Sequence, residues 1–305
     1  MNCRWFSWVA ITAAAVAAAL SRAQAPERPT IVLETYFVSN ESPRGAAHRL
    51  SWFEVRAPLA RNLEVVHSQI QLPANHLDDE GYIAYWHAGN RLRFGRFRQT
   101  FGFGDWSELF YTPFISFPMI RMLPVDRGHS LIRASVGADL SLLLGEHELQ
   151  VGLIESPVPD QQFVHSDPNL LIVRLQKPVG SLILGINALR PLDDGPAAHG
   201  LDVRWSTAQW QVRGELVQGA TAPHVGSHYL DVTYRPPGQT RLKLGVRTEA
   251  YGRRGQPTAR LDTLALRYVV SPHVTLSLNR ASGNGVGAAG GMSGWSFQTM
   301  FMVTY

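Results

Sequence analysis

Alternation of apolar and polar residues is the dominant pattern along this chain. In 130–142, Ile132, Val136 and Leu140 belong to an apolar set at every second position, with Arg133 and Asp139 in the polar set between them. A period of two with one wholly apolar face indicates a β-strand. Segments of this kind recur roughly every 17 residues, which predicts an all-β fold.

Sixteen such segments are joined by alternately short and long connections. The short ones carry Pro, Gly or Asn, as hairpin turns require, whereas long ones such as 156–168 are more polar or Gly-rich. This arrangement is typical of a transmembrane antiparallel β-barrel, so we expect about 16 strands with short periplasmic turns and long extracellular loops. Fourteen strands is the alternative, if 30–38 and one neighbour stay unpaired. The predicted strands are 30–38, 49–56, 63–72, 81–87, 91–98, 130–144, 147–155, 169–176, 181–189, 200–206, 209–218, 228–235, 240–250, 260–269, 273–281 and 294–305.

Aromatic residues gather near the ends of these strands, as Trp205, Trp210, Tyr234 and Tyr268 do. Girdles of aromatic residues at the two membrane interfaces explain that placement. A secreted soluble β-protein would also alternate, but it gives no reason for aromatic strand ends. Backbone groups inside a bilayer must all be paired, so the predicted strands must close into a barrel.

The first residues have the pattern of a secretory signal peptide. Arg4 precedes an apolar run, 9–20, that is too short to span a bilayer, and Ser21-Arg-Ala23 supplies the small residues of a cleavage site. We expect cleavage after Ala23, with an uncleaved anchor as the alternative, and a single barrel domain over 24–305. The one cysteine, Cys3, lies in the leader, so disulfides, thiolate metal sites and cysteine nucleophiles are excluded from the mature chain.

Charge and histidine spacing exclude other classes of protein. Loss of Arg4 and Arg22 with the leader lowers the formal charge from +4 to +2, too small a surplus for a nucleic-acid-binding protein. His224 and His228 have a metal-like spacing without a third ligand. We therefore expect no metal, cofactor or nucleic-acid partner.

One connection, 99–129, is much longer than the others and lies between the fifth and sixth predicted strands. Its apolar residues, among them Phe101, Trp106, Phe114 and Phe117, can bury enough surface to keep the connection ordered. Loops of this length are usually functional when ordered. We expect this one to pack against the inner wall of the barrel.

Two features resemble bacterial outer-membrane porins. The chain ends in Tyr305 after alternating apolar residues, similar to the signal that the barrel-insertion machinery reads. Leu92-Arg-Phe-Gly-Arg-Phe-Arg-Gln-Thr-Phe-Gly102, with Asp126-Arg-Gly128 further on, resembles the phosphate-selective porin O and P family. Thr100 stands where that family has proline, the chain is shorter, and the lysine-rich loop is missing, so the resemblance implies a porin rather than phosphate selectivity. It also implies a homotrimer and an inward-folded constriction loop at 99–129.

Charged residues on the polar faces are the candidate pore lining, because a cation that faces lipid at mid-depth costs roughly 2–4 kcal/mol. They either attract anions or pair with acids such as Asp202, Glu215 and Glu249 to brace the wall. Asp105, Glu108 and Arg121 are the candidates within the constriction loop, where we expect them to face the opening. Arg96 and Arg98 fit neither face, so either a bulge at Gly95 resets the alternation or they lie at headgroup level. The predicted lining residues are Arg91, Arg93, Arg133, Asp139, Arg174, Arg204, Arg213, Arg241, Lys243, Arg247 and Arg267.

The pattern favours a passive channel. We expect an outer-membrane porin, not an enzyme, that passes small polar solutes by diffusion with a modest anion preference. Outer-membrane lipid is then its surrounding partner. The alternatives are a barrel enzyme of the phospholipase kind, which needs a Ser–His pair facing lipid, and a transporter of hydrophobic solutes, which needs a plug.

Overall fold

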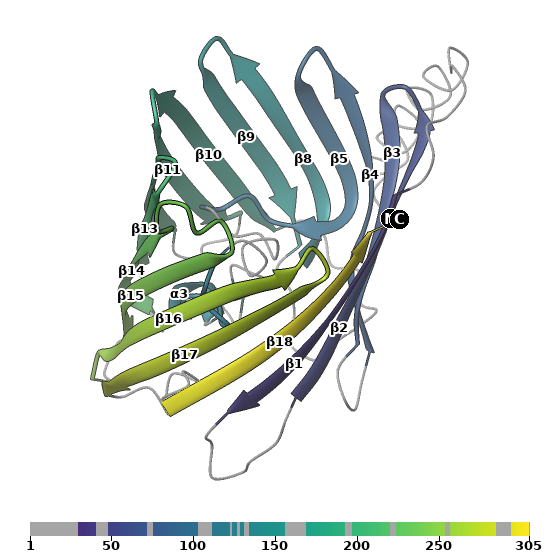
Figure 1. Ribbon diagram of the computed structural model, residues 1–305. Coiled ribbons are helices and arrows are strands. Elements are labelled where there is room, and N and C mark those ends of the chain that lie inside the picture. Colours follow the sequence, from purple (N-terminus) through teal and green to yellow (C-terminus); the bar gives the residue numbers. More distant parts are fainter. Residues whose placement is uncertain are drawn as a thin grey trace, which may run out of the picture.

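Sixteen antiparallel strands close into a barrel in the computed structural model of this chain (Figure 1). The structure describes residues 30–40, 48–71, 76–102, 112–122, 124–126, 129–130, 134–155, 169–192, 197–219, 224–253, 257–284 and 294–304. Neighbouring strands in the chain are neighbours in the barrel, and pairing of the first strand with the last closes it. The predicted all-β transmembrane barrel of sixteen strands is confirmed.

The barrel strands are β1 (Thr30–Asn40), β2 (His48–Ala60), β3 (Leu63–Gln71), β4 (His76–His87), β5 (Asn90–Arg98), β8 (Ala134–Leu144), β9 (His147–Ile154), β10 (Leu170–Val179), β11 (Leu182–Pro191), β12 (Ala198–Ser206), β13 (Trp210–Gly219), β14 (His224–Tyr234), β15 (Leu242–Arg253), β16 (Ala259–Ser271), β17 (Val274–Asn284) and β18 (Gly294–Thr304).

All the short turns lie at one end of the barrel, the upper end in Figure 1, and the long connections lie at the other. The turn between β4 and β5 consists of Ala88 and Gly89, whose φ angles are 48° and 81°. Positive φ at both positions gives the turn a twist that matches the twist of the strands. Val32 pairs with Thr304, so β1 begins and β18 finishes on the short-turn side of the barrel.

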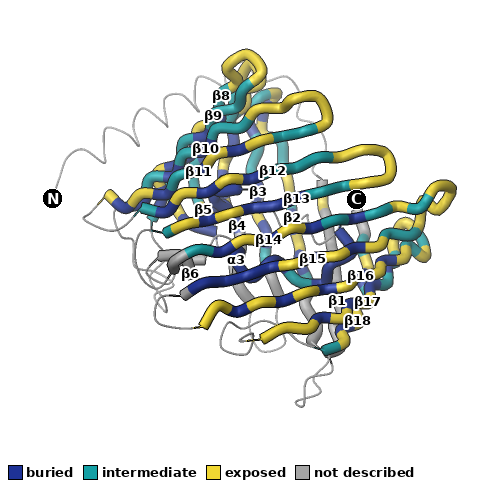
Figure 2. Tube along the Cα trace, turned by 90° about the vertical axis from the view of Figure 1, so that its left-hand side faces the viewer, coloured by how far each residue is buried: buried dark blue, intermediate teal, exposed yellow. Residues whose placement is uncertain are grey.

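The two faces of each strand differ as the alternation predicts, and Figure 2 shows buried and exposed residues following one another along the strands. In β16, Thr263, Ala265 and Arg267 are buried, while Leu264 and Leu266 are exposed. Leu264 exposes 61% of its surface although it is apolar. Apolar side chains point outward and polar ones inward, which is the inversion that a lipid surrounding requires.

Two glycines allow close contact between strands of the inner wall from β4 to β9. Tyr82 pairs with Gly95, Gly95 with Gly137, and Gly137 with Ile154, so all four lie in one row on the inner face. A Cβ on Gly95 would lie 2.8 Å from the Cα atom of Tyr82, and a Cβ on Gly137 would lie 2.8 Å from the Cα atom of Ile154. Only residues without side chains permit this close approach of neighbouring strands.

The sixth barrel strand begins later than predicted. β8 starts at Ala134, whereas β7 (His129–Ser130) pairs with β6 (Pro124–Asp126) in a separate two-stranded sheet. The alternating pattern extends through 130–144, but it does not show that 129–130 pair with β6 rather than with a barrel strand. The long connection therefore runs from 99 to 133, and we call it the lumen loop. It also contains a short helix, α3 (Met119–Met122), and no helix among the described residues is long and apolar enough to cross a membrane.

Gly95 does not reset the faces of β5. The pairing of β5 with β4 and β8 continues through Gly95 without a register shift, and Gly95 has a φ of 125°. Arg96 is exposed, whereas Arg98 is buried, with a guanidinium nitrogen 3.6 Å from a carboxylate oxygen of Glu80. The bulge alternative is therefore wrong, and Arg98 lies inside the barrel where the lumen loop begins. The signal peptide, 1–23, and Tyr305 lie outside the described residues.

Candidate functional site

The described parts of the lumen loop pack against the inner wall formed by β11 to β17. Phe101, Phe114, Phe117 and Ile120 are buried, in keeping with the aromatic content of the connection. Phe103, Trp106 and Phe110 lie outside the described residues. The segments 99–102 and 112–122 lie inside the barrel, where the constriction loop was expected, because their side chains contact residues that face the lumen.

Two wall glycines make room for the loop. A Cβ on Gly200 of β12 would lie 2.8 Å from the Cζ atom of Phe101, and a Cβ on Gly245 of β15 would lie 2.9 Å from the Cζ atom of Phe114. Contacts this short do not occur between real atoms, so a larger residue at either position would displace the aromatic ring. The loop therefore occupies space that the wall leaves open by omitting side chains.

Polar wall side chains bind the backbone of the loop at several points. The amide of Gly102 donates to Oδ1 of Asn187 (2.8 Å), and the amide of Met119 donates to Oε2 of Glu249 (2.5 Å). Backbone groups buried away from water must find such partners. Because the partners come from strands on both sides of β13, the loop is attached along its length rather than at its ends alone.

Arginines of the wall complete this attachment. Arg247 donates to the carbonyl oxygen of Ser116 (2.7 Å), and Arg267 donates to that of Thr112 (2.9 Å). The Cζ atom of Arg247 also lies 4.1 Å from the ring centroid of Phe114, a cation–π distance. These two predicted lining residues therefore hold the loop in addition to facing the lumen.

Arg121 does not face the opening, and that prediction is wrong. It donates to the carbonyl oxygen of Phe101 (2.6 Å) and forms a buried ion pair with Glu215 of β13. The hydroxyl of Tyr229 donates to the same carboxylate (3.0 Å). Arg121 points toward the wall because Glu215 lies behind the loop, which the sequence of the loop alone does not reveal. Asp105 and Glu108 lie outside the described residues.

Four of the other predicted cations, Arg91, Arg93, Arg174 and Arg213, form ion pairs within the wall. Arg93 binds Asp139 with one nitrogen at 2.8 Å and another at 2.5 Å, and a nitrogen of Arg91 lies 3.8 Å from the same carboxylate. Arg174 binds Asp202 across two strands at 2.9 Å. These residues therefore brace the wall, the second of the two roles considered from the sequence, with Arg91 and Arg93 sharing the single carboxylate of Asp139.

A chain of three charges continues this bracing on β13 to β15. Asp231 accepts from Arg213 (2.6 Å) and from Arg247 (2.6 Å), so a single carboxylate serves two arginines. Asp231 was not among the predicted site residues, and neither were Asn187 and Glu80. Their inward positions in alternating strands were a signal that they face the lumen, but their partners depend on the register between strands.

Two pairs of like charges lie at directly opposed positions in the wall, although Arg213 is also bound to Asp231. Arg204 of β12 lies directly opposite Arg213 of β13, and Lys243 of β15 lies opposite Arg267 of β16. Like charges at paired positions repel each other, so this part of the wall has a positive local potential. Both pairs lie toward the short-turn end of the barrel. Arg241 is exposed in the turn before β15, and Arg133 lies outside the described residues.

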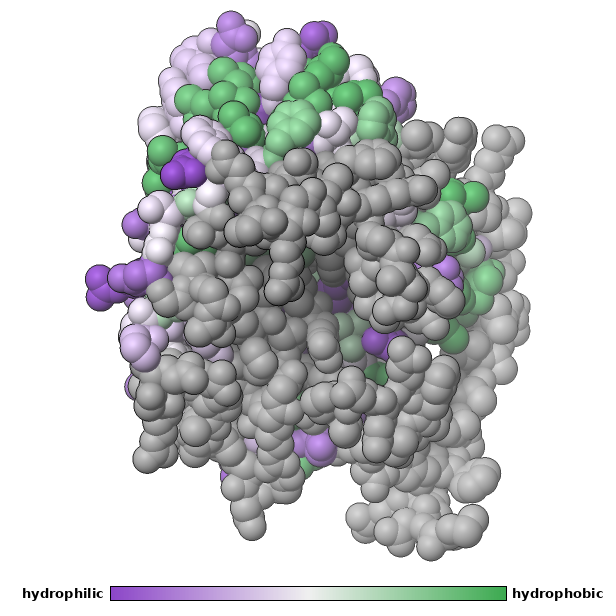
Figure 3. Space-filling view, turned by 90° about the horizontal axis from the view of Figure 1, so that it is seen from below, coloured by the Kyte–Doolittle hydropathy of each residue, from purple (hydrophilic) through white to green (hydrophobic). Residues whose placement is uncertain are grey.

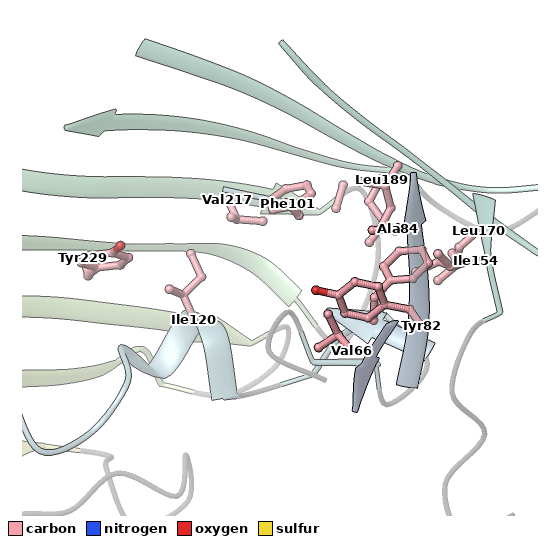
Figure 4. Packing of buried hydrophobic residues seen from close by; sticks show 13 residues of the cluster. Val66, Tyr82, Ala84, Phe101, Ile120, Ile154, Leu170, Leu189, Val217 and Tyr229 are labelled. Carbon is pink, nitrogen blue, oxygen red and sulfur yellow. The ribbon is translucent and has the colours of Figure 1, made fainter. Parts of the chain in front are cut away.

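An apolar cluster lines the wall beside the loop (Figure 4). Tyr82, Ile154 and Leu170 come from β4, β9 and β10, and Phe101 and Ile120 come from the loop. In the view of Figure 4, Phe101 lies near Val217, and Ile120 lies near Tyr229. The cluster joins the loop to the barrel by the burial of apolar surface, so the loop is part of the packed fold. Among the described residues, no group of three or more His, Cys, Asp or Glu side chains is placed to hold a metal ion.

Comparison with solved structures identifies the architecture. A mutant of the porin of Rhodobacter blasticus has a TM-score of 0.64 at 8% identity, covering 90% of this chain and 99% of that one. The fold is that of the bacterial porins. OmpT lacking loop L8, an outer membrane protein of Vibrio cholerae, has a TM-score of 0.60 at 10% identity over 92% of this chain and 100% of that one. Salmonella typhi OmpF in complex with daunomycin has a TM-score of 0.62 at 7% identity over 91% and 97%.

No protein-family model and no curated protein sequence matches the chain. At identities of 7–10% the structural likeness extends to the fold. The resemblance to the phosphate-selective porins therefore receives no support beyond the general porin architecture, and the sequence pattern of 92–102 remains its basis.

Proposed function

We propose that this protein is a porin of the bacterial outer membrane, which lets small polar solutes diffuse through a water-filled lumen with a modest anion preference. The observation that carries the proposal is the lumen loop, which is held against the inner wall of a sixteen-strand barrel by the wall's own side chains. A loop fixed in this position narrows the passage and sets which solutes pass.

The outer surface and the two ends of the barrel support the proposed location. Exposed apolar residues such as Leu201, Leu230 and Leu264 form a belt that suits lipid. In this proposal the short turns are periplasmic, the long connections are extracellular, and the leader is removed after Ala23. Tyr305 is then part of the signal for insertion, and three copies assemble as a homotrimer.

The anion preference has a narrower basis than the number of arginines suggests. Arg93 and Arg174 are each compensated by an aspartate, so they add little to the potential in the lumen. In this proposal the preference comes from positions where two cations lie side by side, Arg204 opposite Arg213 and Lys243 opposite Arg267, although Arg213 also binds Asp231. Phosphate selectivity is not part of the proposal.

Recordings of single channels in a planar bilayer test the proposal. We expect discrete conductance steps and a reversal potential on the anion side in a KCl gradient. That shift should shrink as salt rises, because exposed charges are screened within about 10 Å at 0.1 M. Hydrolysis of phospholipid vesicles by the purified barrel without ion conductance would favour the enzyme alternative. Passage of apolar solutes alone would favour the transporter.

A further inference from the structure

Polar and charged side chains form a band on the outer surface of seven adjacent strands, β11 to β17, at their long-loop ends. They point outward because each is separated by an odd number of residues from the buried, lumen-facing residues of its strand. All of them are exposed. The charged and titratable members of this outer polar band are Arg190, His199, His228, Arg260, Asp262 and Arg280.

The strand register aligns several members of the band. His199 lies opposite Gln218, and Thr248 lies opposite Asp262, which in turn lies opposite Ser282. Arg280 lies two residues along β17 from Ser282, on the same face and opposite Leu264. Polar groups on β12 and β13, and on β15 to β17, therefore lie side by side, whereas His228 of β14 lies opposite Leu216 and Ala250.

Apolar residues begin immediately beside the band on every strand. Leu201 follows His199, Leu230 follows His228 and Leu264 follows Asp262, each two residues further toward the short turns and each exposed. Figure 3 views the long-loop end and shows hydrophilic and hydrophobic side chains together on the flank of the barrel. In the proposed membrane location, this edge is the level at which acyl chains end and lipid headgroups begin. An outward arginine there costs only about 0–1 kcal/mol, far less than at the bilayer midplane.

The band has an excess of positive charge. The band contains three arginines and one aspartate, so its net charge is +2 when both histidines are neutral. The Cζ atom of Arg280 lies 5.4 Å from the ring centroid of Trp295, itself exposed on β18. A guanidinium beside an interfacial tryptophan is positioned at headgroup depth.

We propose that the outer polar band binds the phosphate groups of lipid headgroups in the leaflet around the long-loop end. Guanidinium groups form paired, charge-assisted hydrogen bonds with phosphate, and the apolar residues below the band receive the acyl chains of the same lipid. The inference rests on the proposed membrane location, and it adds a specific lipid class as a partner.

Native mass spectrometry of the full-length barrel in detergent tests this inference. The protein is titrated with dioleoyl phosphatidic acid and, separately, with dioleoyl phosphatidylcholine, which has the same chains but no net charge. We expect the wild type to bind the acidic lipid about 10-fold more tightly, and R260Q/R280Q to lose most of that preference. R280Q alone is compared with K177Q, which removes an exposed outward cation at the short-turn end and should leave the preference unchanged.

Three results would overturn the inference. The first is equal affinity of the wild type for both lipids. The second is a loss of lipid preference in K177Q as large as that in R280Q. The third is an unchanged lipid preference in R260Q/R280Q together with dissociation of an oligomer. The last result would assign the band to contact between copies of the chain. Channel recordings on the same samples separate the two proposals. Conductance without lipid preference removes this inference alone, whereas lipid preference without conductance removes the porin proposal alone.

Discussion

Arg121 of the lumen loop and Glu215 of β13 form an ion pair in which neither side chain exposes more than 2% of its surface. Arg121 also binds the carbonyl oxygen of Phe101, at the start of the loop, and Glu215 also accepts from Tyr229. One buried pair thus joins the two arms of the loop to each other and to the wall. Its position behind the loop makes it a structural element rather than part of the pore surface.

Removing this carboxylate should detach the loop while the barrel stays closed. Breaking a buried ion pair by removing one partner costs about 3–5 kcal/mol, because the remaining charge is left in a poorly solvated site. We expect E215Q to become sensitive to trypsin after Arg121 and to unfold at a lower temperature. Glu148, a half-exposed acid that accepts from Ser141, supplies the control E148Q, which should leave trypsin resistance intact. Equal resistance in both variants would contradict a role for Glu215 in holding the loop.

The wall glycines should tolerate no side chain where the loop touches them. In G245V the new methyl groups would overlap the ring of Phe114, and overpacking of this kind costs about 1–3 kcal/mol. We expect a lower unfolding temperature and a more variable channel conductance. Gly152 provides the control, because a Cβ there would lie 3.6 Å from its nearest neighbour and G152A should resemble the wild type. A G245V barrel as stable as G152A would mean that the loop is not packed against β15.

The sequence predicts the barrel well because strand faces follow a local rule. Val136 and Leu140 point outward and Asp139 points inward, as period two requires, and this holds whichever strands are neighbours. Strand ends do not follow from this rule, since 130 still alternates although β7 pairs inside the loop. Alternation carries no information about when a segment leaves the main sheet.

The partners of the site residues could not be predicted from the same rule. Arg174 and Asp202 are 28 residues apart and meet because β10, β11 and β12 are adjacent with no side chain at Gly185 between them. Arg121 turns to the wall because Glu215 happens to lie at that depth. Such contacts depend on register and loop path, which single residues do not specify.

Charge removal in the lumen should change ion selectivity, whereas the same change outside should not. Lys243 faces inward opposite Arg267, and Lys177 faces outward at the short-turn end of β10. K243Q and K177Q lower the net charge equally, so any difference between them reports position. We expect the reversal potential of K243Q in a KCl gradient to shift toward cations and that of K177Q to match the wild type. Identical reversal potentials in all three proteins would argue against the anion preference.

Deletion of 112–121 should raise the single-channel conductance, because these residues fill part of the lumen. The segment is attached through Thr112 to Arg267, through Ser116 to Arg247 and through Met119 to Glu249, all on the inner wall. Shortening it removes volume from the passage and leaves the sixteen strand pairings untouched. The control protein lacks the same total number of residues, taken partly from 285–293 and partly from 41–47. Both of these connections join strands at the long-loop end. The control should conduct like the wild type, and equal conductance of all three proteins would mean that the loop does not narrow the channel.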